Sequence, residues 1–239
     1  MFPITQTKTE FALTHKLIYA WPKVGKTTLA AQQKVGSKIP LFIMTEDGEG
    51  TLTIAKARVK DWKHFTKLVE LLEKQAEKVK ETYSCLVIDL ISDLDQWCQE
   101  SIAKDNNVKH VSDLSYGKGF NLAKEEFRSQ LSKLMALLPV TFIAHSGEKD
   151  VIVNGETIKV QKPQLSTGAY DFVNGKVDTI MYISPANSKK DQSEVVIQGS
   201  KMAICGSRFP QINDTFLFPK DRPEQVYVDI NNRFKGSEQ

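Results

Sequence analysis

A short stretch of the chain combines the residue types that hold phosphate groups. Ala20 is followed by Trp21-Pro22-Lys23-Val24-Gly25-Lys26-Thr27-Thr28, which matches the pattern G-x-x-x-x-G-K-[ST] except that alanine takes the first glycine position. Backbone N–H groups at a helix start carry partial positive charge, and Gly25 lets the chain approach an anion without a Cβ. We predict that Pro22 to Thr28 bind ATP, with Lys26 on the β- and γ-phosphates and the Thr27 hydroxyl on Mg²⁺. A chance Gly-Lys-Thr in an ordinary turn is the alternative, and the flanking strand and helix patterns argue against it.

Asp89 is the carboxylate predicted to bind the metal. It follows Leu86-Val87-Ile88, a continuous apolar run typical of a strand buried on both faces. A carboxylate at the end of such a strand, beside the phosphate-binding loop, can hold water on Mg²⁺. An aspartate that only caps a helix or turns the chain is the alternative. That interpretation is preferred for Asp93 and Asp95, which come later.

Hydrolysis also needs a group that orients or deprotonates the attacking water. Glu46 comes directly after the apolar run 41–44, so a parallel sheet would place it near the γ-phosphate. Asp47 and Glu49 compete for this role. A solvated acidic turn is the alternative.

A polar group that senses the γ-phosphate is predicted where the apolar run 140–144 ends. His145 and Ser146 occupy this position. Such a residue can pass the presence of the phosphate to the loop that follows. A strand-end histidine with an ordinary structural partner is the alternative.

A parallel sheet must bring these groups together. Strands are predicted for the apolar runs 16–20, 41–44, 85–88 and 140–144. Helices are predicted over 27–33, 61–83 and 120–138, the last two from apolar residues spaced three and four apart. Residues 105–120 are polar and contain glycine, which favours a loop or a broken helix. A strand, turn, helix and strand in this order indicate an α/β fold with a mostly parallel central sheet flanked by helices.

The C-terminal third has a different character. Asn154-Gly155 between two β-rich runs predicts a hairpin over 151–160. Strands are predicted over 176–184 and 193–198, the last two as an antiparallel pair. We expect one domain over 1–239, with an N-terminal extension at 1–14 and a flexible tail at 219–239, which is rich in proline and charge.

Composition narrows the class of protein. The chain has 239 residues, a net charge of +3 and 41% hydrophobic residues, which describes a globular protein rather than a disordered one. Three scattered cysteines, Cys85, Cys98 and Cys205, do not form a disulfide framework or a zinc motif. No apolar run approaches the length that spans a bilayer, and the N-terminus has no apolar signal segment. We therefore expect a cytoplasmic protein without a membrane partner.

In order and spacing, these motifs resemble those of the RecA-like P-loop ATPases, and above all the short phage-encoded members of the single-strand annealing and recombination group, often described as phage nucleotide-binding AAA proteins. The matching segments are PKVGKTT, IMTEDGEGTL, CLVIDLISDL, YGKGFNLAKEEF and TFIAHSGE. The resemblance implies that Glu46 is the catalytic glutamate and Asp89 the Walker B aspartate. It implies that His145 is the γ-phosphate sensor, where RecA itself usually has glutamine.

The resemblance also implies two loops that face DNA, the first around residues 105–120 and the second around residues 146–170. Their candidate contacts are Lys109, Tyr116 and Lys118 in the first loop and Lys149, Lys159 and Lys162 in the second. The second loop is neutral by count and aromatic side chains are few, so a protein or small-molecule ligand stays open. Family members often carry a basic residue that reaches a neighbouring subunit's γ-phosphate, and Arg208, then Lys201, are the candidates here. A solvated turn is the alternative.

Together these features predict a Mg²⁺-dependent ATPase of DNA recombination or annealing that binds single-stranded DNA as a homo-oligomer. A single-strand-binding protein is a further expected partner, and the setting is a phage protein in the host cytoplasm. The alternative is a nucleotide-gated loader or regulatory module that acts on a protein partner. A small-molecule kinase is less well supported, because arginine is scarce and no lid segment is evident.

Overall fold

The centre of the molecule is a large, mostly parallel sheet built on β1 (Lys16–Ala20). The computed structural model describes residues 10–46, 52–153, 155–186, 192–200 and 202–236. Strand order along the sheet is β10-β8-β7-β1-β5-β4-β2-β3. The other strands of this path are β2 (Ile39–Met44), β3 (Ala55–Arg58), β4 (Tyr83–Asp89), β5 (Val140–Val153), β7 (Thr179–Ser184), β8 (Ser193–Val196) and β10 (Thr215–Phe218).

The predicted strands are confirmed, and their direction explains where the site lies. β1 pairs in parallel with both β5 and β7, and β4 lies in parallel between β2 and β5. Every residue of β1 is buried, as expected for a strand covered on both faces. Because parallel strands end at the same edge, the residues after β1, β2, β4 and within β5 meet there.

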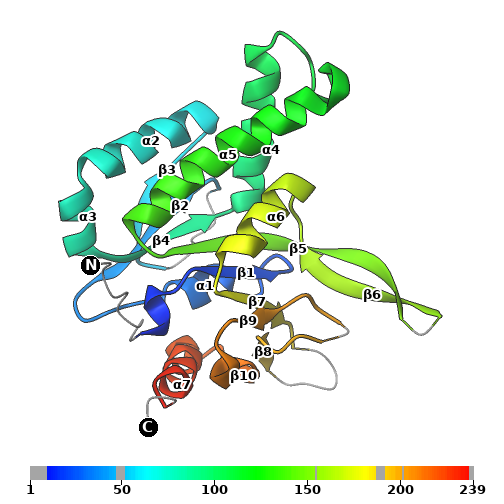
Figure 1. The fold of residues 1–239 in the computed structure, drawn as a ribbon. Coiled ribbons are helices and arrows are strands. Elements are labelled where there is room, and N and C mark those ends of the chain that lie inside the picture. Colours follow the sequence, from blue (N-terminus) through cyan, green and yellow to red (C-terminus); the bar gives the residue numbers. More distant parts are fainter. Residues whose placement is uncertain (1–9, 47–51, 154, 187–191, 201, 237–239) are drawn as a thin grey trace, which may run out of the picture.

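Helices cover both faces of the sheet (Figure 1). One face carries α2 (Trp62–Lys74), α4 (Ile91–Asp105), α5 (Lys118–Leu137) and α6 (Thr167–Lys176), with α3 (Ala76–Thr82) after α2. The opposite face carries α1 (Lys26–Ala30) and α7 (Pro223–Lys235), together with the short helical turn η1 (Phe11–Leu13). Each face has its own apolar core, so the sheet is the shared wall between two buried clusters.

The C-terminal third contains antiparallel strand pairs, as predicted, while β7 also pairs in parallel with β1. β5 continues past the body of the sheet and pairs with β6 (Glu156–Pro163) in a long hairpin that projects from the molecule in Figure 1. β8 pairs antiparallel with β7 and with β10, and β9 (Gly206–Ser207) pairs antiparallel with β7. The hairpin is longer than the predicted 151–160 because its first strand is the extension of a central strand.

The structure differs from the sequence-based expectation in several elements. The predicted flexible tail contains α7, which buries Val226, Tyr227, Ile230 and Phe234 in the core. The single helix predicted over 61–83 is divided at Gln75 into α2 and α3. The helices α4 and α6 and the strand β3 were not predicted. The helix α4 was missed because the polar Asp95 falls within its buried stripe, and β3 because it alternates small and charged residues at the sheet edge.

Candidate nucleotide-binding site

The predicted phosphate-binding loop connects the end of β1 to the start of α1. Gly25 is the N-cap of α1 and has φ 104°, a left-handed conformation that glycine adopts without strain. Lys23 also has a positive φ of 63°. The loop therefore turns sharply enough for Lys26 to begin the helix directly below the strand end.

The Lys26 ammonium lies at the centre of the site. Its side chain is buried, and Nζ donates to the carbonyls of Ala20 and Trp21 at 3.3 and 3.1 Å and lies 3.4 Å from Nδ1 of His145. Burial lowers the pKa of Lys26, although the nearby carboxylates of Asp89 and Glu46 oppose this change. Among the described residues Lys26 has no ion pair with a carboxylate, so its charge is available to an anion such as a phosphate group.

Thr27 and Asp89, the two predicted metal ligands, are brought into direct contact. The Thr27 hydroxyl donates a 2.6 Å hydrogen bond to Oδ2 of Asp89, which ends β4. Burial raises the pKa of Asp89, and the hydrogen bond from Thr27 acts against that rise. Two oxygen donors at the end of a buried strand, beside a buried cation, fit Mg²⁺ with a nucleotide phosphate. Thr27 and Asp89 would hold the metal, and Lys26 would hold the phosphate.

Glu46 follows β2 and lies near the charged groups of the site. Its carboxylate acts on the pKa values of Lys26, Asp89 and His145, so it is close to all three. The side chain is exposed and can meet a water molecule. Its competitors Asp47 and Glu49 lie outside the described residues.

Thr45 holds the ends of β2 and β4 together. Its backbone N–H donates to the carbonyl of Asp89 at 2.9 Å, and its hydroxyl accepts from the N–H of Leu90 at 3.0 Å. The same hydroxyl donates to Oδ2 of Asp93 at 2.6 Å. Thr45 therefore links the end of β2, which precedes Glu46, to the end of β4 at Asp89 and to Asp93 in α4.

His145 lies at the middle of the long strand β5, opposite Ala20 of β1. Burial lowers the pKa of His145, and the neighbouring Lys26 ammonium lowers it further. The imidazole is therefore neutral at pH 7 and can accept or donate a hydrogen bond near a phosphate. The next residue, Ser146, donates to Oε1 of Gln161 at 2.6 Å and so joins β5 to β6.

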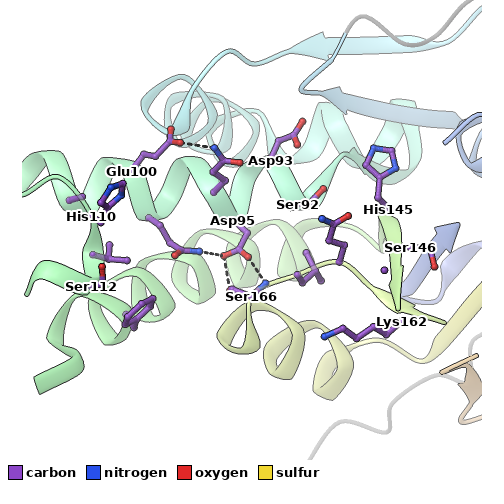
Figure 2. Close-up of a pocket in the computed structure, with 18 of the residues that line it drawn as sticks. Ser92, Asp93, Asp95, Glu100, His110, Ser112, His145, Ser146, Lys162 and Ser166 are labelled. Atoms are coloured by element: carbon purple, nitrogen blue, oxygen red, sulfur yellow. Dashed lines mark hydrogen bonds between the residues drawn. The ribbon is translucent and has the colours of Figure 1, made fainter. Parts of the chain in front are cut away.

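A cleft of about 1040 Å³ extends from the site along α4 (Figure 2). It begins at Trp21 and His145 and is lined farther on by both segments that were predicted to face DNA. Lys109 and Lys162 belong to its lining, which also contains the carboxylates of Asp93, Asp95, Glu100 and Glu148. Asp95 is buried and accepts from both the N–H and the hydroxyl of Ser166, which fixes the end of the second segment to α4.

The remaining predicted DNA contacts lie outside this cleft. Tyr116 is fully exposed in the turn before α5, and Lys118 begins that helix. Lys149 and Lys159 are on the projecting hairpin, where Lys159 forms an exposed ion pair of 3.1 Å with Glu148. The structure therefore divides the six residues between the cleft, the α5 turn and the hairpin.

Arg208 is not brought to the site of its own chain. Its guanidinium donates to the carbonyl of Gly175 at 2.9 Å and lies 3.5 Å from Oδ1 of Asp178, directly before β7. This is the opposite end of the parallel strands from the phosphate-binding loop, because Thr179 pairs with Lys16 at the start of β1. Lys201, the second candidate, lies outside the described residues. A role of Arg208 across a subunit boundary stays a prediction.

Three residues that shape the site are not predicted by the sequence patterns. Asp93 and Asp95 were interpreted as cap or surface residues, yet Asp93 bonds to Thr45 and Asp95 holds Ser166. Thr45 was not considered. Asp93 lies in the first turn of α4, as a cap residue would, and its bond to Thr45 joins segments 48 residues apart that no local spacing indicates. No sequence pattern indicates the partner of Asp95, since the contact joins segments far apart along the chain.

Comparison with known proteins supports a nucleotide-binding domain. From residue 14 to residue 209, the chain matches the model of a family described as an AAA domain. It is also similar to the SPbeta prophage-derived uncharacterized protein YorG of Bacillus subtilis (strain 168), with 25% identity over 235 residues, 92% of this chain and 68% of that protein. Within the part of the chain that the structure describes, no helix is long and apolar enough to cross a membrane.

Proposed function

Because this chain belongs to the AAA domain family, a class of nucleotide-binding ATPases, we propose that it hydrolyses ATP with Mg²⁺ and couples hydrolysis to single-stranded DNA during recombination or strand annealing. The observation that carries the ATPase is the convergence of Lys26, Thr27, Asp89 and His145 at one sheet edge. The similarity to a prophage-derived protein supports a phage setting.

Each residue has a role that follows from its position. Lys26 neutralises charge on the β- and γ-phosphates, and the backbone from Pro22 to Thr28 surrounds them. Glu46 orients the attacking water and accepts its proton, while the neutral imidazole of His145 contacts the γ-phosphate. When bound through Thr27 and Asp89, Mg²⁺ supplies charge stabilisation for the departing diphosphate.

We further propose that residues outside the cleft bind single-stranded DNA. The lysines of the projecting hairpin, Lys149 and Lys159, with Tyr116 and Lys118 near α5, offer charge and one stacking surface outside the cleft. Assembly as a homo-oligomer would place several hairpins along one strand and would let Arg208 approach a neighbouring site. A single-strand-binding protein is a proposed partner in the same process.

A nucleotide-gated module that acts on a protein partner is the second candidate function. The observation that favours it is the lining of the cleft, where four carboxylates face two lysines. Such a surface repels a phosphate backbone and suits a polypeptide with polar or basic side chains. In that case ATP stabilises one conformation of the cleft with little turnover.

The deciding experiment measures ATP hydrolysis with and without single-stranded DNA, at low and high salt. Strong stimulation that weakens as salt rises supports the DNA-coupled ATPase, because phosphate contacts release counterions. ATP binding without DNA stimulation or a gel shift supports the protein-partner module. Absence of Mg²⁺-dependent ATP binding would overturn both.

A further inference from the structure

The last strand of the chain reaches the phosphate-binding loop. Phe218 ends β10, and its side chain is 5% exposed within the apolar core below the sheet. A Cβ built on Gly25 would lie 2.8 Å from Cε1 and 3.2 Å from Cζ of Phe218. The aromatic ring therefore fills the space beside the Cα of Gly25. Any side chain at position 25 would clash with this ring.

This contact falls on the residue that shapes the loop. Gly25 holds φ 104° as the N-cap of α1 and directly precedes Lys26. Val24 packs against the same apolar cluster as Phe218. That cluster also contains Val226 and Tyr227 of α7, so the floor of the loop is made by the C-terminal segment. The match to the AAA domain family ends at residue 209, before this segment begins.

We propose that Phe218 is a positioning residue for nucleotide binding, which holds Gly25 and the adjoining N–H groups in the phosphate-binding conformation. This inference rests on the proposed binding of ATP at Lys26. A loop that is held in one conformation binds its ligand at full affinity, whereas a loop that samples other conformations binds in proportion to the competent fraction. The ring acts from behind the loop and does not touch the reacting atoms.

The strand supplies a matched control. Phe216 is two residues earlier on β10, so it faces the same side of the strand, and it is 7% exposed. Its ring lies under the guanidinium of Arg233, 5.6 Å from the centroid. Phe216→Leu and Phe218→Leu therefore remove the same atoms from the same core, and only the second change removes the ring beside Gly25.

The test compares the full-length wild type and both variants by calorimetric titration with ATPγS and Mg²⁺, by ATP turnover and by thermal melting. For Phe218→Leu we expect the Kd to rise about tenfold, as for a loop competent one tenth of the time, with kcat at saturating ATP within about twofold of wild type. Phe216→Leu should lower the melting temperature about as much as Phe218→Leu does, but it should leave the Kd unchanged. Phe218→Met, which refills most of the space, should recover most of the affinity.

The outcomes separate this inference from the proposed function. If the wild type fails to bind ATPγS, the proposed function is wrong and the inference falls with it. If the wild type binds and the two leucine variants have equal Kd values, the inference alone is wrong. A loss confined to kcat also overturns it. If Phe218→Leu does not fold, the comparison rests on the matched pair Phe218→Met and Phe216→Met, and equal Kd values for that pair would overturn the inference.

Discussion

The hydroxyl of Thr27 donates a 2.6 Å hydrogen bond to the carboxylate of Asp89, across 62 residues of sequence. Thr27 lies in the first turn of α1 and Asp89 ends β4, so the bond joins the phosphate-binding loop to a central strand. The bond offsets part of the cost of burying the Asp89 charge. Both residues are therefore already held together at the place where the metal would bind.

Asp89→Asn should stabilise the nucleotide-free protein and abolish turnover. Burial raises the pKa of Asp89 despite the neighbouring Lys26 ammonium, which means that the charged carboxylate costs stability in the folded state. We expect a rise of about 2–4 °C in the melting temperature and a loss of at least about 100-fold in ATP hydrolysis. Asp171→Asn, on the exposed side of α6, is the control. A melting temperature below that of the wild type would contradict the prediction.

Lys26→Met should leave a folded protein without ATPase activity. The variant removes a buried cation whose pKa burial lowers, so the melting temperature should stay the same or rise. Loss of the phosphate contact should reduce turnover by about 100-fold or more. Lys34→Met, which changes an exposed lysine shortly after α1, should behave like the wild type in both measurements. Turnover of Lys26→Met at the parental rate would end the nucleotide-site assignment.

Thr45→Val should slow hydrolysis without weakening ATP binding. The change keeps the shape of the side chain but leaves the N–H of Leu90 and the carboxylate of Asp93 without this partner. Since Glu46 is the next residue, we expect kcat to fall about 10- to 100-fold while the Kd for ATP changes little. Thr45→Ser restores the hydroxyl and should recover most of kcat. Equal rates for the valine and serine variants would contradict the bridging role.

His145→Gln should flatten the pH dependence of stability below neutrality. The folded-state pKa of His145 is lowered, so the unfolded chain binds a proton first as pH falls below about 6.5. Stability linked to this residue is present above the unfolded-state pKa and is lost as pH falls toward the folded-state pKa. Melting curves from pH 8 to pH 5 should show a smaller decline for His145→Gln than for the wild type. An identical decline would show that His145 does not contribute.

Removing two hairpin lysines should weaken DNA coupling but not basal hydrolysis. Lys149→Gln with Lys159→Gln changes exposed side chains on the two strands of the hairpin, neither of which lines the cleft. If both contact phosphates, the slope of log affinity against log salt should fall by about 1 to 2. The matched control is Lys63→Gln with Lys67→Gln on the exposed face of α2. An equal effect of the two double variants would indicate only general electrostatic attraction.

The chain's local patterns were sufficient to predict the central strands and several residues that meet at one edge of the sheet. Apolar runs identified the central strands, and the polar residues that follow them, Glu46, Asp89 and His145, lie at one edge because parallel strands end together. The pattern around Gly25 and Lys26 predicted the phosphate-binding loop, because the chemistry of such a loop depends on residue types at short spacing.

Other parts of the site depend on contacts that no local pattern encodes. The bridge from Thr45 to Asp93, the fixing of Ser166 by Asp95 and the packing of Phe218 against Gly25 each join distant segments. Local spacing could identify groups able to bind a phosphate, because their chemistry resides in a few neighbouring residues. Which side chains hold those groups in place, and that Arg208 lies at the far end of the strands, follows only from how the sheet and its two helical layers pack.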